Sequence, residues 1–271
     1  MKNATQWIII ALSVAYVQFG NAQNVKDKSE DKMKIEIWSD VMCPFCYIGK
    51  RHLEAALEQF PDKDRVEIEW KSFQLNPEIP MQIDNPQSVY EYLAEAKGIS
   101  YEQSVKMHEH VEQMASNAGL DYHFEKAVVA NSFNAHRVMQ MAKTKGLGDK
   151  AEECFFRSYF TEGKDISDTN TLMALGNEIG LTNAEVEESL RNDEYAYRVN
   201  QDVAESRQIG VRGVPFFVFD RKYAVSGAQP VETFLSTLEQ SVAEWKKENN
   251  IPELKVQEGD GPVCKPDEKC K

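Results

Sequence analysis

The sequence predicts an α/β fold that is interrupted by a long all-α segment, and three observations lead to this prediction. Strand patterns occur in two separate parts of the chain, at Lys34–Phe73 and at Val214–Ser226. Between about residues 76 and 209, helix signals follow one another without a strand pattern. A Cys-x-x-Cys motif lies where the first strand turns into a helix.

The first part predicts a strand, a helix and a second strand. In Lys34–Asp40, isoleucines alternate with charged residues, as in a strand with one buried face. Ile48–Phe60 places apolar side chains on one helical face before Pro61 ends the helix. In Arg65–Phe73, apolar residues again alternate with charged residues, as in a second strand. Such a unit is expected to be parallel, with a right-handed connection.

A proline-rich loop over Asn76–Asn85 separates this part from the helical segment. Helices are expected from Pro86 to Gly98, from Ser100 to about Gly119, from Asn131 to Gly146, from Asp149 to about Thr161, from Asp168 to about Ile179, after Thr182, and from Asp193 to Gln208. Ser100 with Gln103, and Thr182 with Glu185, have the spacing of a capping box.

Strand signals resume after the helical segment. Val214–Phe219 is a continuous apolar run, typical of a strand buried on both faces. Asp220-Arg221 is expected to form a hairpin turn into Lys222–Ser226, and Pro230 begins a last amphipathic helix. The predicted division is residues 34–75 and 210–247 for the two halves of the α/β domain, 76–209 for the helical insertion and 248–271 for a flexible tail.

Cys43-Pro44-Phe45-Cys46 carries the predicted chemistry. A helix N-terminus has unpaired N–H groups and the positive end of the helix dipole, which favour a negatively charged thiolate. Pro44 suits the first helical turn, where its missing N–H loses no bond. We therefore predict a redox dithiol in which Cys43 attacks and Cys46 resolves.

The same motif is also found in zinc sites and in inert structural bridges. A zinc site needs two further ligands at short spacing, and the other close pair, Cys264 and Cys270, is more than 200 residues away. The strand before and the helix after the motif favour the redox interpretation. Cys154 lies among aromatic residues and is expected to be a buried core thiol.

The N-terminal residues predict export. Trp7–Phe19 is mostly apolar, and Gly20-Asn21-Ala22 supplies small residues for a cleavage site, so residues 1–22 are interpreted as a signal peptide and 23–33 as a flexible lead-in. A membrane anchor is the alternative, but its span needs about 20 apolar residues. The formal net charge of −13 argues against nucleic acid and anionic lipid as partners.

Four stretches of the sequence resemble the DsbA-like thiol-disulfide oxidoreductases of the thioredoxin superfamily, and within them the FrnE-like branch. They are Ser39–Gly49, Phe133–Arg137, Tyr159–Gly163 and Gly213–Val218. The resemblance covers about Lys34 to Trp245. It implies a thioredoxin fold with an inserted all-α domain, and oxidase or isomerase activity on protein clients with thiols or disulfides.

The resemblance also implies that the Val214–Pro215 bond is cis and faces the dithiol, although the sequence alone favours trans, since few X-Pro bonds are cis. Val214 and Pro215, with Pro44 and Phe45, are then expected to contact the substrate, and the Val214 backbone to pair with an extended client. A redox partner protein or glutathione would restore the dithiol. No cofactor, metal or stable membrane insertion is predicted.

Phe45 occupies a position where some strongly oxidising relatives have His, so a less extreme oxidant is expected. Cys264 and Cys270 are expected either to exchange with the active site, as the resemblance suggests, or to form a structural bridge. His136 and Arg137 border the cleft by the same resemblance, but a role on the helix surface is equally open.

Two other functions compete with thiol-disulfide exchange on proteins. Hydroxychromene-carboxylate isomerases and kappa-class glutathione transferases share the helical insertion, but generally have serine in place of the first cysteine and use glutathione. Cys43 and the predicted signal peptide argue against them. A client-holding module without catalysis is the third possibility.

Overall fold

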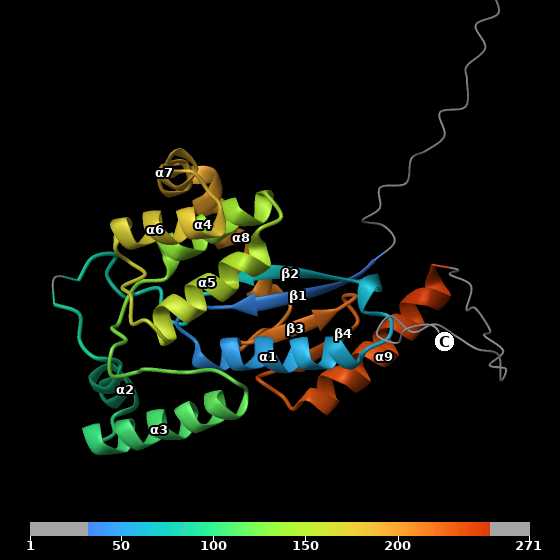
Figure 1. Cartoon of the computed structure of the whole chain (residues 1–271), viewed down its shortest axis with the longest axis horizontal. Helices are drawn as coiled ribbons and strands as arrows, with labels where there is room; N and C mark the ends of the chain where they lie inside the picture. Colours follow the sequence, from blue (N-terminus) through green and yellow to red (C-terminus); the bar gives the residue numbers. More distant parts are fainter. Residues whose placement is uncertain (1–31, 84, 250–271) are drawn as a thin grey trace, which may run out of the picture. The chain divides into compact units, whose positions relative to one another are not determined.

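The computed structural model describes residues 32–83 and 85–249. Four strands form one sheet in the order β2-β1-β3-β4 (Figure 1): β1 (Met33–Ser39), β2 (Val66–Ser72), β3 (Phe216–Phe219) and β4 (Tyr223–Ser226). β1 and β2 are parallel, whereas β3 runs antiparallel to β1, and β4 antiparallel to β3. The two strand-bearing parts of the sequence therefore build a single sheet around the predicted parallel unit.

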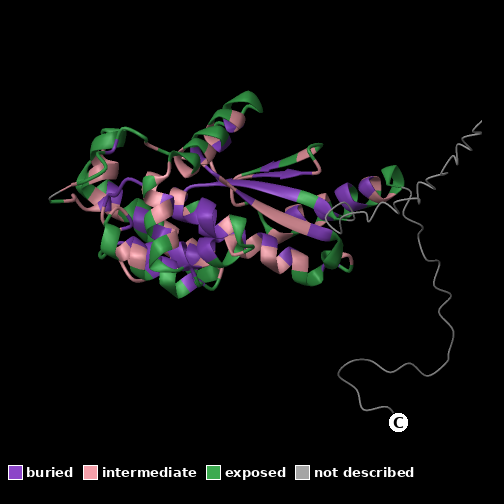
Figure 2. Ribbon diagram, turned by 90° about the horizontal axis from the view of Figure 1, so that it is seen from above, coloured by how far each residue is buried: buried purple, intermediate pink, exposed green. Residues whose placement is uncertain are grey.

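Helices α1 (Pro44–Gln59) and α9 (Val231–Glu248) pack against one another along one face of this sheet (Figure 1). Alternation along the strands directs Ile35, Ile37, Phe217 and Phe219 into the core that these helices cover. Leu53 from α1 and Phe234, Leu238, Val242 and Trp245 from α9 fill the same core. Figure 2 shows buried residues along the strands, and these are most frequent in β1 and β3.

Seven helices lie between β2 and β3 in the sequence: α2 (Val89–Lys97), α3 (Tyr101–Asn117), α4 (Phe133–Thr144), α5 (Gly148–Phe160), α6 (Thr169–Ile179), α7 (Asn183–Arg191) and α8 (Asp193–Gln208). α4 packs against α5, α6, α7 and α8, while α5 and α8 also contact β2. α2 and α3 pack together, and α3 contacts α1. A 3₁₀ turn, Lys63–Arg65, precedes β2.

Local signals set the ends of these helices. The capping boxes of Ser100 with Gln103 and of Thr182 with Glu185 are formed as predicted. Ser88 and Glu91 form a third capping box, and α2 therefore begins at Val89. The prediction that Pro86 opens this helix is wrong. The predicted hairpin turn is confirmed, because Asp220 and Arg221 have φ of 50° and 55°, which turn the chain from β3 into β4.

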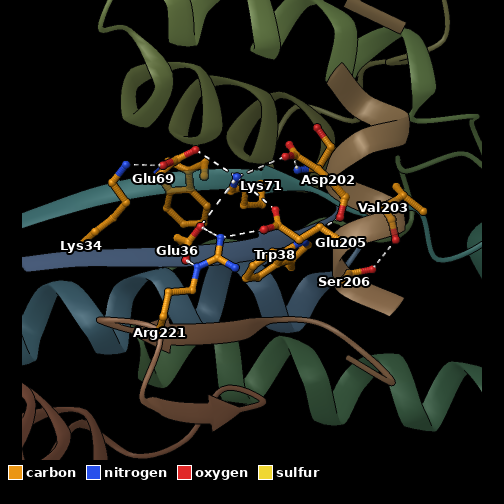
Figure 3. Close-up of polar contacts among 12 residues, drawn as sticks. Lys34, Glu36, Trp38, Glu69, Lys71, Asp202, Val203, Glu205, Ser206 and Arg221 are labelled. Carbon is orange, nitrogen blue, oxygen red and sulfur yellow. Dashed lines mark hydrogen bonds and ion pairs between the residues drawn. The ribbon is translucent and has the colours of Figure 1, made fainter. Parts of the chain in front are cut away.

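An ion-pair network connects α8 to the face of the sheet that lies opposite α1 and α9 (Figure 3). The Lys71 ammonium lies 3.1 Å from Glu69, 3.3 Å from Glu205, 3.5 Å from Asp202 and 3.7 Å from Glu36. Arg221, from the β3–β4 turn, pairs with Glu36 and Glu205. These contacts connect four segments that are distant in sequence.

The predicted α/β fold with an inserted set of helices is confirmed. The division at residues 75 and 209 stays a prediction. Within residues 32–83 and 85–249, no helix is both long and apolar enough to cross a membrane. The predicted signal peptide and the cysteine pair at residues 264 and 270 lie outside the described residues, as does the predicted tail beyond residue 249.

Candidate active site

Cys43 and Cys46 lie together at the N-terminus of α1. Cys43 is the N-cap residue, its N–H donates to the Asp40 carbonyl (2.9 Å), and its own carbonyl accepts from the Cys46 N–H (3.0 Å). Pro44 occupies the first helical turn, as predicted. In the described helix α1, no acidic residue lies in the first turn to oppose a negative charge at Cys43.

The two sulfurs differ in their surroundings. Both cysteines are buried free thiols, Cys43 with 3% and Cys46 with 1% of its surface exposed, but of the two only Cys43 lines the adjoining cavity. Burial, and then the neighbouring Cys43 sulfur, raise the pKa of the Cys46 thiol well above its ordinary value, while the Asp40 backbone and the Ser39 side chain oppose the increase. Reduced Cys46 therefore carries a proton at neutral pH.

Val214 and Pro215 face the dithiol from the start of β3. The Val214–Pro215 bond is cis, as the family resemblance implied. The Cys43 thiol donates to the Val214 carbonyl at 3.4 Å, across 171 residues of sequence. The Pro215 carbonyl accepts from the Gly227 N–H (2.8 Å), whereas the Val214 N–H has no backbone partner among the described residues. The structure thus brings four of the predicted site residues together: Cys43, Cys46, Val214 and Pro215.

A cavity of about 480 Å³ adjoins these residues. Cys43, Pro44, Phe45 and Val214 line one side of it. The rest of its lining comes from the loop after β2, from α2 and α3, and from neighbouring segments, and is mainly apolar: Met42, Leu75, Ile79, Val89, Leu93, Met107, Val111, Phe124, Val129 and Phe160. Phe45, Leu75 and Met107 are exposed at 38%, 51% and 42%, which is unusual for large apolar side chains and marks a surface suited to binding.

The sequence analysis gave no role to Tyr122, which supports the motif from the helical region. Its hydroxyl donates to the Pro44 carbonyl at 2.8 Å. The ring stacks on Phe160, with centroids 4.6 Å apart. Asp40 was also missed as a supporting residue: its carboxylate accepts from the N–H groups of Leu75 (2.7 Å) and Met42 (3.3 Å). Tyr122 carries no sequence signal, since the contact depends on how the loop after α3 folds.

The other candidates do not line the cavity beside the dithiol. Cys154 is buried, as predicted. Arg137 donates to the carbonyls of Ser189 and Asn192 and is not among the residues that line the cavity. His136 is 1% exposed, so a role on the helix surface is wrong for it; the ring lies 3.5 Å from Asp40. Among the described residues, no three His, Cys, Asp or Glu side chains are grouped to hold a metal.

Comparison with known proteins identifies the family. Residues 34–239 match the family described as DSBA-like thioredoxin domain. The chain belongs to the DSBA-like thioredoxin domain family. Its predicted thioredoxin fold, with added helices, is thereby confirmed, and it is an enzyme of the DsbA-like oxidoreductase class.

Three known proteins show how far the similarity extends. The probable DsbA oxidoreductase SCO1869 from Streptomyces coelicolor is 35% identical, with a TM-score of 0.74, over 87% of this chain and 97% of that one. The uncharacterized protein YwbO of Bacillus subtilis is 26% identical over 68% of this chain and 85% of its own. The cytosolic disulfide reductase DsbM from Pseudomonas aeruginosa shares the fold at 18% identity and a TM-score of 0.57, over 78% of this chain and 99% of that one.

Proposed function

We propose that the chain is an exported thiol-disulfide oxidoreductase or isomerase that acts on protein clients through Cys43 and Cys46. The observation that carries this proposal is the arrangement of the two thiols at the α1 N-terminus, with the Val214 carbonyl 3.4 Å from the Cys43 sulfur. Cys43 and Val214 line the large cavity, so a client bound there meets Cys43 first. Cys46 lies behind it and is suited to resolution.

The reaction runs in two exchange steps. A client thiolate attacks the Cys43 sulfur of the Cys43–Cys46 disulfide; a client–Cys43 disulfide forms, and Cys46 leaves with the electron pair and takes up a proton. A second client thiolate then attacks the client sulfur of this mixed disulfide, and Cys43 leaves as a thiolate. The client has lost two electrons and the enzyme has gained them. In isomerisation, reduced Cys43 attacks a client disulfide instead.

The cavity indicates the class of substrate. Its mainly apolar lining and about 480 Å³ volume fit apolar side chains of an unfolded or extended protein segment. The Val214 N–H and carbonyl can pair with such a segment as an added strand. Glutathione has two carboxylates, but among the described residues the lining offers only Lys97 as a cationic side chain, since burial lowers the pKa of the His108 imidazole below its ordinary value. The lining therefore favours a protein client over glutathione as the substrate.

Export, as predicted for residues 1–22, would place the dithiol in a compartment where client disulfides persist. A redox partner protein or glutathione would then restore the working redox state. We further propose that Cys264 and Cys270 either exchange with this dithiol or form a structural bridge. Comparing the full chain with its C264S/C270S variant distinguishes the two, since only exchange changes the rate at which the dithiol is restored.

The equilibrium between Cys43–Cys46 and glutathione tests the proposal, measured on the full chain with Cys264→Ser and Cys270→Ser. For this two-electron couple, about 30 mV corresponds to a tenfold change in the equilibrium constant. A potential well above that of the glutathione pool identifies a disulfide donor, and one near or below it an isomerase or reductase. Absence of any exchange with glutathione would contradict the proposed redox dithiol.

Client assays complete the test. We expect the oxidised chain to accelerate disulfide formation in a reduced, unfolded protein, and Cys43→Ser to abolish this. Reduced Cys46→Ser, mixed with a client that carries a disulfide, should accumulate the mixed disulfide, because Cys43 attacks the client disulfide and no Cys46 resolves the product. If Cys43→Ser still suppresses aggregation of the client, the apolar cavity also holds clients without catalysis. Glutathione-dependent isomerisation of a hydroxychromene carboxylate, without activity on proteins, would favour the small-molecule enzymes instead.

A further inference from the structure

The large cavity beside the dithiol contains a buried imidazole, that of His108, to which the exchange reaction gives no role. His108 lies on α3, is 9% exposed, and lines the cavity together with Met107 and Val111 of the same helix. Tyr90 of α2 and Phe124 pack edge-to-face with the imidazole, with ring centroids 4.8 Å and 4.7 Å away. These two rings hold the imidazole in one place.

One nitrogen of His108 is occupied by the helix backbone. Nδ1 lies 2.8 Å from the carbonyl oxygen of Ser104, one turn earlier in α3. Because a carbonyl oxygen can only accept, Nδ1 carries the proton and donates it. Burial lowers the pKa of the His108 imidazole, so the ring is neutral at neutral pH and has its proton on one nitrogen alone. Nε2 is therefore a hydrogen-bond acceptor.

This acceptor has no partner. Nε2 of His108 makes no hydrogen bond within residues 32–83 and 85–249. Unlike the two ring nitrogens of His136, it is not sealed away from solvent. Because Nδ1 is directed to the backbone of α3 and the ring lines the cavity, the accessible Nε2 edge is the one that faces the cavity.

The other polar side chains of the lining do not offer such an acceptor. The Asn76 amide donates to the Tyr92 hydroxyl (2.7 Å), and the Tyr159 hydroxyl donates to a backbone carbonyl (3.0 Å). Lys97 is exposed, and its ammonium can only donate. Among the described side chains of the lining, Nε2 of His108 is thus the nitrogen or oxygen acceptor that is left for a ligand.

The surroundings of Nε2 limit which donor can reach it. A side chain that fills the cavity displaces the water that otherwise solvates Nε2, so a wholly apolar side chain leaves the acceptor unpaired. The rings of Phe124 and Phe160 and the thioether of Met107 suit an aromatic ring. A lysine or arginine would lose hydration and meet Lys97 in the same cavity. Tyrosine combines an apolar ring with a donor at its tip.

We propose that His108 determines specificity, by accepting a hydrogen bond from the hydroxyl of a tyrosine that lies near the reacting cysteine of the client. This inference rests on the proposed function and describes part of its substrate. While Cys43 forms a disulfide with the client, the tyrosine ring occupies the apolar cavity and its O–H donates to Nε2. The contact positions the client cysteine beside Cys43 and takes no part in the exchange itself.

The test isolates attack by Cys43. It uses the full chain with Cys46→Ser, Cys264→Ser and Cys270→Ser, reduced and mixed with short peptides whose single cysteine forms a disulfide with thionitrobenzoate. Cys43 attacks the peptide sulfur, the peptide–Cys43 disulfide forms, and thionitrobenzoate, the better leaving group, departs with the electron pair. Stopped-flow absorbance of thionitrobenzoate near neutral pH gives the second-order rate constant. Without Cys46 the reaction ends at this step.

Three series of peptides share one alanine- and serine-based sequence and differ in one residue, placed at successive positions before and after the cysteine. This residue is tyrosine, phenylalanine or O-methyltyrosine, which keeps the oxygen but cannot donate. The variant is His108→Phe, which keeps a ring between Tyr90 and Phe124 but has no acceptor. His110→Phe is the control, because His110 lies on the same helix, is exposed and does not line the cavity.

At the positions that reach the cavity, we expect the tyrosine peptide to react about 10-fold faster than the phenylalanine and O-methyltyrosine peptides, as one hydrogen bond and the unpaired acceptor it avoids imply. His108→Phe should remove this advantage by slowing the tyrosine peptide, without slowing the phenylalanine peptide. His110→Phe should keep the advantage in full. If His108→Phe does not fold, the comparison of tyrosine with O-methyltyrosine on the chain that keeps His108 decides.

Equal rates for tyrosine and phenylalanine at every position would overturn the proposed role of His108. The same conclusion would follow if O-methyltyrosine reacted as fast as tyrosine, or if a folded His108→Phe variant kept the preference. Failure of the proposed function has a different result: no peptide would then release thionitrobenzoate faster than it does with a chain in which Cys43→Ser is added.

Discussion

The Val214 carbonyl oxygen accepts a hydrogen bond from the Cys43 thiol at 3.4 Å, although 171 residues separate them. The antiparallel pairing of β1 with β3 makes this contact possible, since it places the start of β3 beside the end of β1. The site therefore depends on how closely α1 approaches the Val214–Pro215 peptide.

Gly49 controls this approach. A Cβ atom at Gly49 would lie 3.0 Å from Cγ of Pro215 and 3.1 Å from Cζ of Phe217. In a helix, alanine is favoured over glycine by about 0.5–1 kcal/mol. Overpacking a core costs about 1–3 kcal/mol, so we expect Gly49→Ala to lower the free energy of unfolding and to slow exchange at Cys43. Urea unfolding measures the first effect, and the rate at which reduced Cys43 reacts with the chromogenic disulfide dithiobis(nitrobenzoate) measures the second.

Gly148, in the first turn of α5, provides the control. A Cβ atom there would meet its nearest neighbour at 3.8 Å, an ordinary contact. Gly148→Ala should therefore leave stability unchanged or raise it by the helix preference alone. Equal behaviour of the two variants would show that α1 and Pro215 are not tightly fitted.

Much of this fold can be predicted from the sequence, because it depends on local sequence patterns. The alternation of Ile35 and Ile37 with charged residues, and the capping spacings at Ser100 and Thr182, were confirmed within one or two residues. The predicted start of α2 was wrong because Pro86 and Ser88 are both residues that can begin a helix. In the structure the capping box of Ser88 sets the start. Cys43 and Cys46 were identifiable because their chemistry depends on spacing at one strand–helix junction.

The residues that surround the site cannot be predicted from local sequence patterns. Tyr122 reaches the dithiol motif, and Glu152 reaches a small cavity beside β2 and α4, only through tertiary packing, and neither residue belongs to a spacing pattern. A glutamate on an amphipathic helix is usually solvated, and only the packing of α5 against β2 and α4 places Glu152 inside. Burial of such residues is a property of the whole fold.

Tyr122 should contribute to the stability of the motif through one hydrogen bond. In Tyr122→Phe the ring can keep its stacking on Phe160, but the Pro44 carbonyl loses its donor at 2.8 Å. We expect a loss of about 0.5–1.5 kcal/mol in the free energy of unfolding, measured in urea. Tyr90→Phe is the control, since the Tyr90 hydroxyl has no hydrogen-bond partner among the described residues. A loss of similar size in both variants would contradict a specific role for the hydroxyl.

Asp202 should be the most costly residue to remove from the ion-pair network in Figure 3. Its carboxylate is buried and accepts from the Ser72 N–H (2.9 Å) and the Gln140 amide (2.6 Å), besides facing Lys71. Asp202→Ala leaves these donors unpaired, so we expect a loss of about 3–5 kcal/mol. Glu205→Ala, on the same helix but more exposed, should cost about 1 kcal/mol or less. Thermal unfolding of both variants tests this difference.

Glu152 and Glu153 are neighbours on α5 whose replacement should have opposite pH dependence. Burial raises the pKa of Glu152 well above its usual range. For Glu153, burial is outweighed by Arg51, Tyr47 and Lys50, and its pKa falls to about 2. A carboxyl with a raised pKa contributes stability that is fully present below its unfolded pKa and is lost as pH rises toward the folded pKa. A carboxyl with a lowered pKa contributes stability above its unfolded pKa that is lost as pH falls toward about 2.

Glutamine keeps the shape of each side chain but does not titrate. Relative to the unmodified chain, Glu152→Gln should therefore become more stable as pH rises above the ordinary glutamate range, because the unmodified chain alone must keep a proton on, or bury a charge at, residue 152. Glu153→Gln should be less stable at neutral pH, and this deficit should disappear toward the acid end of the range. Urea unfolding of the three proteins across a pH series measures both differences. Parallel curves for the two variants would mean that the two carboxyls share one environment, which would contradict the burial of Glu152.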